Sequence, residues 1–336
     1  MDSDTPAIEV SNLTRSFTTH IKQPGLRGAL RGLFHRQYQT KIAVNDISFS
    51  IKRGEFVGFL GPNGAGKTTT LKILAGVLHP SSGTAQVLGY VPWKRESPLQ
   101  KRFSLVLGQK NQLWWDLPAY DSFVLNRDIY DIPQAQFAPK VEELTTLLDL
   151  RKLLHVPVRK LSLGERMKCE VAASLLHSPE VLFLDEPTIG LDVVSQVRIR
   201  EFLRDYNERT GITVLLTSHY MADIEALCKR VLIINEGRAI FDGQLKELAN
   251  SIAQRRRIRL TLKNTPGVGS ALALQEIGED IEIDGLRVGL SVERDQVPQK
   301  VSQLLQQFEV DDLTVEDVEI ESVIRDLFTQ DSHAQK

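Results

Sequence analysis

The distribution of apolar and polar residues along the chain predicts an α/β protein. Short apolar runs that end in polar or glycine-rich segments indicate buried parallel strands at 56–60, 181–184 and 213–216. Apolar residues recur at helical spacing between these runs, in 141–154 and from 163 to about 177, where Pro179 stops the pattern. Strands and helices that alternate across 40–235 predict a mainly parallel sheet.

The pattern changes at about residue 251, where a run of arginines precedes a more acidic region. Strands are expected at 258–263, 281–284, 287–292 and 313–319, and helices at 269–277, 296–308 and 321–328. Asp284-Gly285 marks a hairpin turn, so the order βαββαβ predicts a small ferredoxin-like α+β domain. We therefore expect two domains, 1–250 and 251–336.

A basic segment, residues 18–44, separates the strands expected at 7–10 and 47–51. It contains Lys and Arg but no acidic residue, and its leucines recur at helical spacing beside a basic stripe. Three glycines oppose the amphipathic helix that this spacing predicts. Two interpretations stay open: residues 22–37 contact anionic lipid headgroups or a membrane partner, or the helix packs on its own domain.

Composition narrows the class of protein. The net charge of −2 offers no support for nucleic-acid binding, and we expect no such partner. Two cysteines among 336 residues exclude a disulfide scaffold and suit a reducing cytosol. The first nine residues lack the pattern of a signal peptide, and no run of about 18 apolar residues occurs, so we expect a cytoplasmic protein that reaches a membrane through a partner.

The stretch Val57–Thr69 contains the phosphate-binding pattern G-x-x-x-x-G-K-[ST]. Glycines let several backbone N–H groups approach a polyanion, and the helix that follows points its positive N-terminus at the phosphates. Lys67 is expected to serve binding and catalysis at the β and γ phosphates, and Thr68 to ligate Mg²⁺. The expected nucleotide contacts are Gly61, Pro62, Asn63, Gly64, Ala65, Gly66, Lys67, Thr68 and Thr69. A strand-to-helix turn without a ligand is the alternative.

Further motifs follow in a fixed order. They are GQKNQLWWDLP at 108–118, LSLGE at 161–165, an apolar strand that ends in Asp185-Glu186, Leu191-Asp192, and TSH at 217–219. With these motifs the segment 7–245 resembles the ATP-binding subunit of an ABC transporter. The first two are similar to exporters of the ABC-2 type, notably the viologen and multidrug branch. The resemblance implies a P-loop NTPase cassette with a helical subdomain at about 90–178.

The resemblance also implies roles for the residues at the ends of the strands. Asp185 would hold Mg²⁺ through water, and Glu186 would polarise the attacking water. Gln109 matches the glutamine that contacts Mg²⁺ or this water, with Gln112 as its competitor. His219 matches the histidine that distinguishes triphosphate from diphosphate.

The signature segment Ser162, Leu163 and Gly164 matches the part that contacts the γ-phosphate bound to the opposite subunit. Leu163 replaces a usual glycine and Glu165 a usual glutamine, which puts the turnover rate in doubt more than the function. Asp192 matches a loop that bridges the two subunits. A capped helix without a ligand is the alternative for the signature segment.

Three aromatic positions complete the resemblance. Phe17 matches the aromatic residue that stacks on adenine, and Tyr38 is a possible substitute because the basic segment follows Phe17. Trp114 and Trp115 lie where family members touch the membrane partner. Adjacent residues cannot both face one core, so at least one is expected at an interface; burial of both in an irregular loop is the alternative.

The resemblance implies an ATPase that uses ATP and Mg²⁺, pairs head to tail as a homodimer, and drives a separate transmembrane permease. A non-transport ABC ATPase and a regulatory ATP-binding module are the alternative functions. The cassette does not touch the cargo, so drugs, lipids, sugar polymers and viologens all fit this prediction.

Overall fold

The computed structural model describes residues 5–20, 38–108, 110–218, 220–248, 255–265, 268–317 and 324. The chain divides into two compact units, Met1–Gly243 and Gln244–Lys336. Each unit has its own cluster of buried hydrophobic residues.

A six-stranded sheet forms the centre of the first unit. Its order is β5 (Phe103–Leu107), β6 (Val181–Asp185), β7 (Thr213–Ser218), β3 (Phe56–Leu60), β8 (Arg230–Asn235) and β9 (Arg238–Gln244). The pairs from β5 to β8 are all parallel, as the apolar runs predicted. The carboxyl ends of these strands therefore share one edge, where ligands of open α/β sheets bind.

A second sheet of the first unit is antiparallel, with the order β2 (Tyr38–Ile51), β1 (Ile8–His20) and β4 (Ser82–Val87). The prediction of short strands at 7–10 and 47–51 was wrong in extent. Three register shifts in β1 disturb the alternation of apolar and polar residues beyond Val10, so the pattern does not show the rest of the strand. The ends of the basic segment, 18–20 and 38–44, belong to these strands. Residues 21–37 lie outside the described residues, and the helix and the lipid contact stay predictions.

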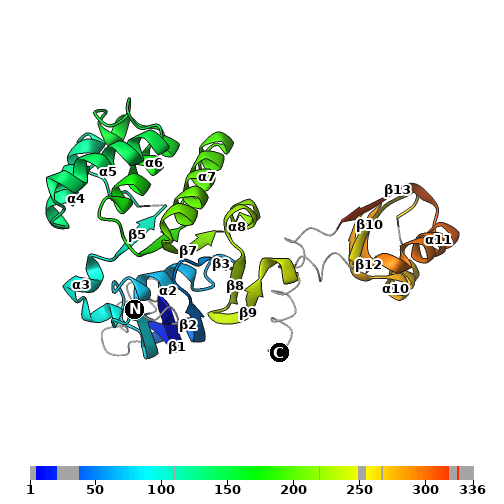
Figure 1. Cartoon of the computed structure of the whole chain (residues 1–336). Coiled ribbons are helices and arrows are strands. Elements are labelled where there is room, and N and C mark those ends of the chain that lie inside the picture. The colour runs from blue at the N-terminus through cyan, green and yellow to red at the C-terminus, as the bar shows by residue number, and fades with distance from the viewer. Residues whose placement is uncertain are drawn as a thin grey trace, which may run out of the picture. The chain divides into compact units, whose positions relative to one another are not determined.

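Helices α4, α5 and α6 gather into a helical group beyond the β5 edge of the sheet (Figure 1). The described part of the first unit contains the helices α2 (Lys67–Leu74), α3 (Ser97–Gln100), α4 (Ala119–Ile129), α5 (Gln134–Leu147), α6 (Leu163–Leu175), α7 (Val193–Thr210) and α8 (Met221–Leu227), with 3-10 turns η1 (Pro92–Lys94) and η2 (Val158–Lys160). This arrangement confirms the α/β fold with a helical subdomain.

The helix predicted at 141–154 starts and ends earlier than expected. Helix α5 ends at Leu147, and Asp149 takes a left-handed conformation with φ 53° that the helix cannot continue through. Leu150 and Leu154 are nevertheless buried in the turn that follows, so the apolar period runs past the helix end. The periodicity therefore predicted burial at most of its positions, with Leu147 exposed, but it did not predict the backbone conformation.

The second unit contains an antiparallel sheet with the order β11 (Glu279–Asp284), β12 (Arg287–Glu293), β10 (Arg255–Leu262) and β13 (Val310–Asp317). Helices α10 (Val268–Ile277) and α11 (Val297–Gln307) and the turn η3 (Arg294–Gln296) complete the order βαββαβ. This topology confirms the ferredoxin-like prediction. Apart from residue 324, the helix expected at 321–328 lies outside the described residues.

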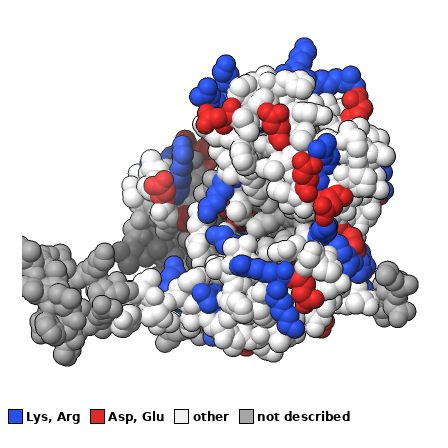
Figure 2. All heavy atoms as spheres, turned by 90° about the vertical axis from the view of Figure 1, so that its left-hand side faces the viewer, with Lys and Arg blue, Asp and Glu red and all other residues white. Residues whose placement is uncertain are grey.

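The surface carries charges of both signs (Figure 2), and the cysteines are not paired in disulfides. Lys and Arg are interspersed with Asp and Glu over much of the face shown in Figure 2. Cys169 in α6 and Cys228, which directly follows α8, are buried free thiols. No helix within the described ranges combines the length and the apolar character that a membrane span requires.

Candidate functional site

The phosphate-binding loop joins β3 to α2. Strand β3 is buried along its whole length, and it delivers the loop to the carboxyl edge of the sheet. Gly66 at the N-cap of α2 has φ 108°, and a Cβ there would lie 2.2 Å from the carbonyl oxygen of Ala43. Only glycine fits this position, because both the conformation and the space exclude a side chain.

Lys67 is buried in this loop, with 5% of its surface exposed. Its Nζ donates hydrogen bonds to the carbonyl oxygens of Gly61 and Pro62, the second at 3.2 Å. Burial lowers the pKa of Lys67, and the negative charges of Glu186 and Asp185 partly offset this effect. The loop thus holds an ammonium group at the N-terminus of α2, where anions are favoured.

Asp185 joins three elements at the end of β6. Its Oδ1 accepts hydrogen bonds from the Thr68 hydroxyl of α2 at 3.0 Å and from the Thr217 hydroxyl of β7 at 2.7 Å. The structure thus brings together Thr68 and Asp185, two of the predicted Mg²⁺ ligands. Hydroxyl and carboxylate oxygens are ligands that Mg²⁺ prefers, so this pair fits the ion.

Glu186 follows Asp185 in a left-handed conformation with φ 53°, which is strained for a residue with a side chain. Its N–H donates to the carbonyl oxygen of Thr217 at 3.0 Å and to the Thr217 hydroxyl at 3.1 Å. A Cβ at Gly108 would lie 2.1 Å from the carbonyl oxygen of Glu186, so the turn needs glycine there. These contacts hold the backbone of Glu186 at the ends of β6 and β7.

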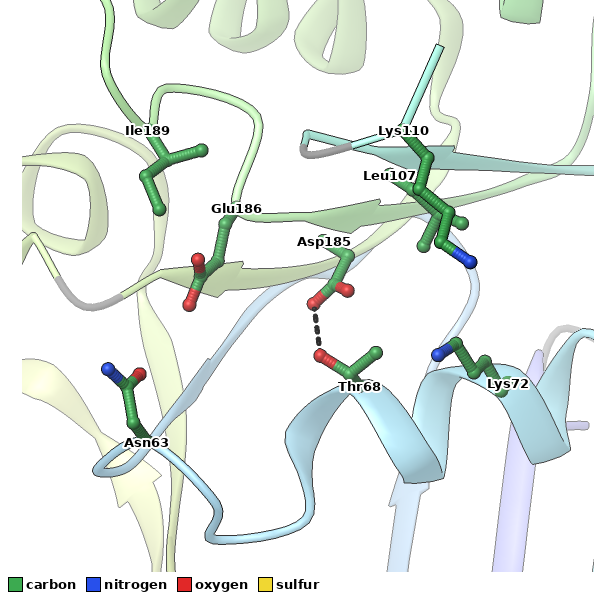
Figure 3. Close-up of a pocket in the computed structure, with 8 residues that line it drawn as sticks. All are labelled: Asn63, Thr68, Lys72, Leu107, Lys110, Asp185, Glu186 and Ile189. Carbon is green, nitrogen blue, oxygen red and sulfur yellow. Dashed lines mark hydrogen bonds between the residues drawn. The ribbon is translucent and has the colours of Figure 1, made fainter. Parts of the chain in front are cut away.

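A cavity of about 370 Å³ opens between these residues. It is lined by Asn63, Thr68, Lys72, Leu107, Lys110, Asp185, Glu186 and Ile189 (Figure 3). Lys72 and Lys110 were not among the residues predicted to form the site. Lys72 lies four residues after Thr68 on α2, and this helical spacing could have identified it. Lys110 directly follows Gln109.

A buried carboxylate next to this site was also not predicted. Asp223 of α8 is fully buried, and its Oδ2 accepts hydrogen bonds from the hydroxyls of Thr188 and, at 2.8 Å, Ser218. Arg200 of α7 lies 3.4 Å from the other carboxylate oxygen. Asp223 thus joins the loop after Glu186 to the end of β7.

The signature segment forms the N-terminus of α6. Ser162 is the N-cap, and the Glu165 side chain accepts hydrogen bonds from the N–H and the hydroxyl of Ser162, each at 2.9 Å. These bonds lower the pKa of Glu165. The side chain of Leu163 lies against Gly190. Neither Ser162 nor the two residues after it lines the cavity that contains Thr68.

The remaining predicted residues lie apart from the cavity or outside the described residues. Asp192 caps α7 by accepting hydrogen bonds from the N–H and hydroxyl of Ser195, at 2.9 Å and 2.6 Å. Phe17 lies in β1 with the Arg15 guanidinium 4.7 Å from its ring centroid. Gln109 and His219 are not among the described residues.

A phosphate-binding loop and adjacent carboxylates at the edge of a parallel sheet define a nucleoside-triphosphatase site. A family model described as "ABC transporter" matches residues 44–189, and one described as "EvrA-like ABC transporter, C-terminal domain" matches residues 254–316. The chain is 34% identical over 209 residues to the ABC transporter ATP-binding protein NatA of Bacillus subtilis, which covers 62% of this chain and 85% of NatA.

Two further similarities agree with these matches. Nod factor export ATP-binding protein I of Ralstonia nicotianae is 37% identical over 213 residues, 63% of this chain and 66% of that protein. The solved structure of cbiO1 from Clostridium perfringens, described as part of the ABC transporter complex cbiONQ, superposes with a TM-score of 0.59 at 26% identity over 73% of this chain and 91% of that chain. The chain belongs to the ABC transporter family as one of its ATP-binding subunits, and membership in this family implies hydrolysis of ATP.

Proposed function

We propose that this chain is the ATP-hydrolysing subunit of an exporter of the ABC-2 type, in which two copies act with a separate transmembrane permease. The observation that carries the proposal is the cavity where Thr68, Asp185 and Glu186 meet beside the phosphate-binding loop. The name of the Nod factor relative speaks of export, and it supports this direction of transport.

Residues of the phosphate loop and of the cavity divide the chemistry between them. Backbone N–H groups of Gly61 and of residues 63–69 and the Lys67 ammonium bind the phosphates, while Thr68 and Asp185 hold Mg²⁺. When bound, this ion neutralises charge on the phosphate oxygens. Glu186 accepts a proton from the attacking water, and its orientation depends on the two hydrogen bonds of its backbone N–H. Gln109 and His219 complete the proposed set.

The proposal needs two copies, because the signature tip does not line the cavity of its own chain. The positive N-terminus of α6 suits an anion, which would compete with Glu165 for the Ser162 hydroxyl, but this helix start does not line the cavity beside Thr68. We therefore place the Ser162 tip of each copy, with Asp192 nearby, against the γ-phosphate held by the other copy. ATP then stabilises the closed pair by its greater affinity for that state.

An exposed apolar surface supports the permease contact. Trp114 and Trp115 are 56% and 47% exposed, and Leu117 beside them is 38% exposed. Large aromatic side chains at an interface are frequent anchors of binding. We propose that a cytoplasmic helix of the permease docks here and keeps the chain at the inner face of the membrane.

Replacing Glu186 with Gln tests the proposal, since it removes the base and keeps the shape of the side chain. We expect the variant to bind ATP, to lose at least about a hundredfold in hydrolysis rate, and to form a stable ATP-dependent dimer. Steady-state phosphate release and sedimentation with and without ATP and Mg²⁺ measure these effects.

Glu225→Gln is the matched control, because it neutralises a glutamate of α8 that does not line the cavity. It should hydrolyse ATP like the unaltered protein. Near-normal turnover in Glu186→Gln would remove this residue as the base. An unaltered chain that binds ATP but does not cleave it, even with membranes present, would favour a regulatory module.

A further inference from the structure

The loop that carries the two exposed tryptophans is fastened to the signature helix by a buried carboxylate. Glu170 of α6 is only 2% exposed, and both its carboxylate oxygens lie 3.1 Å from the N–H of Gln112. Burial raises the pKa of Glu170, while the backbone N–H groups of the loop and the charge of Arg166 act in the opposite direction. Without Glu170, the N–H of Gln112 would lose its partner.

The rest of the loop is attached to the same part of the chain. The Arg166 guanidinium, one turn before Glu170 on α6, lies 5.7 Å from the ring centroid of Trp115. The carbonyl oxygen of Trp115 accepts a hydrogen bond from Arg159 N–H, and that of Leu117 from Val158 N–H, both at 3.0 Å. The exposed aromatic surface is therefore continuous with η2 and α6.

Gln112 is also attached to the catalytic sheet. Its side-chain NH₂ group donates a hydrogen bond to the carbonyl oxygen of Leu105 in β5, while its backbone N–H donates to the Glu170 carboxylate. Leu107 and Lys110, between these two attachments in sequence, line the nucleotide cavity. Gln112 thus lies at the point where the chain leaves the sheet and joins the helical group.

Helix α6 provides a stiff connection from this point to the signature tip. Ser162 precedes Glu170 by eight residues, so about 12 Å of helix separates them. The middle of α6 is buried on nearly every side, which leaves it little freedom to bend. A displacement of the loop at Glu170 must therefore move Ser162 as well.

We propose that Glu170 is the positioning residue that couples the surface of Trp114 and Trp115 to the signature tip at Ser162. This inference rests on the proposed function, since the tip acts only in a pair of copies. Coupling between two sites is reciprocal. Closure of the Ser162 tips on ATP must therefore change the surroundings of the tryptophans, even with no permease present.

The test uses tryptophan fluorescence in the full chain. The chain has three tryptophans, so Trp93→Phe leaves Trp114 and Trp115 as the reporters. In this background Glu186→Gln should dimerise with ATP and Mg²⁺, and its tryptophan emission should shift in the same step. Adding Glu170→Ala should abolish most of the shift while ATP still produces the dimer. Glu170→Gln, which keeps one acceptor oxygen, should restore part of it.

Glu180→Ala is the matched control, because this carboxylate pairs with Arg102 and Arg53 and makes no contact with the loop in the described structure. It should leave the emission shift unchanged. A dimer whose shift is the same with and without Glu170, or a dimer without any shift, would overturn the coupling. Failure of the Glu186→Gln parent to dimerise would instead overturn the proposed function.

Hydrogen exchange provides a second measurement that needs no change at Glu170. In the Glu186→Gln parent, peptides that cover 112–117 and 162–170 should gain protection together when ATP is added. Protection of the second peptide alone would show that the loop moves independently of α6, and would contradict the proposal.

Discussion

At the scale of single residues, the site contains a strained backbone and a buried charge, and hydrogen bonds hold both in place. Glu186 keeps a left-handed backbone because Thr217 holds its N–H and Gly108 leaves room for its carbonyl group. Lys67 keeps its buried ammonium group because two loop carbonyl groups accept its hydrogen bonds. Such strain and burial are typical of functional residues, since the surrounding structure must compensate for their cost.

Lys67→Ala should abolish ATP binding, because it removes the one buried cation of the phosphate loop in the described structure. A fluorescent ATP analogue, titrated by anisotropy, measures the affinity. Lys72→Ala removes the same charge from a residue that lines the cavity but lies outside the phosphate loop, so it should weaken binding less. Equal affinity of Lys67→Ala and the unaltered chain would contradict the phosphate-loop assignment.

At the scale of secondary-structure elements, buried polar contacts join neighbouring elements, and one of them should make the free energy of unfolding depend on pH. His177, between α6 and β6, donates from Nε2 to the carbonyl oxygen of Phe103 at 3.2 Å and stacks on Tyr130 with ring centroids 3.8 Å apart. Its Nδ1 is buried without a partner among the described residues. Burial lowers the pKa of His177 to about 4, because a second proton would lie on an atom with no acceptor.

The unfolded chain binds this proton at about pH 6.5, so acid favours unfolding. As the pH falls from about 6.5 to about 4, His177 should lower the free energy of unfolding by about 3 kcal/mol; above pH 6.5 it should have no effect. Urea unfolding at several pH values measures this. His177→Phe keeps a ring against Tyr130 and should lose this part of the pH dependence. An unchanged pH dependence in the variant would exclude His177 as its source.

At the scale of the whole molecule, two separate hydrophobic clusters stabilise the two units. Leu215 of β7 is fully buried in the first cluster, and Leu290 of β12 in the second. The cavity beside the phosphate-binding loop is lined only by residues of the first unit. Because domains with their own cores fold as units, each should respond to changes in its own core.

Calorimetry of the full chain should therefore show two transitions. Leu290→Ala should destabilise the second unit by about 2–5 kcal/mol and lower only its transition. Leu215→Ala is the matched control and should lower only the transition of the first unit. ATP with Mg²⁺ should raise the first transition alone. A single transition that all three changes shift together would contradict the independence of the units.

The sequence by itself determined the features that depend on neighbouring residues. The glycine pattern of the phosphate loop, the apolar strands beside it, the capped start of α6 and the βαββαβ order are all local, because backbone preferences and hydrogen bonds over a few residues produce them. Only the tertiary structure decided which distant residues meet. Thr68 contacts Asp185, and Gln112 contacts Glu170, across segments that the sheet order brings together. The bulged course of β1 and the cavity positions of Lys72 and Lys110 also depend on packing between elements, which no local pattern records.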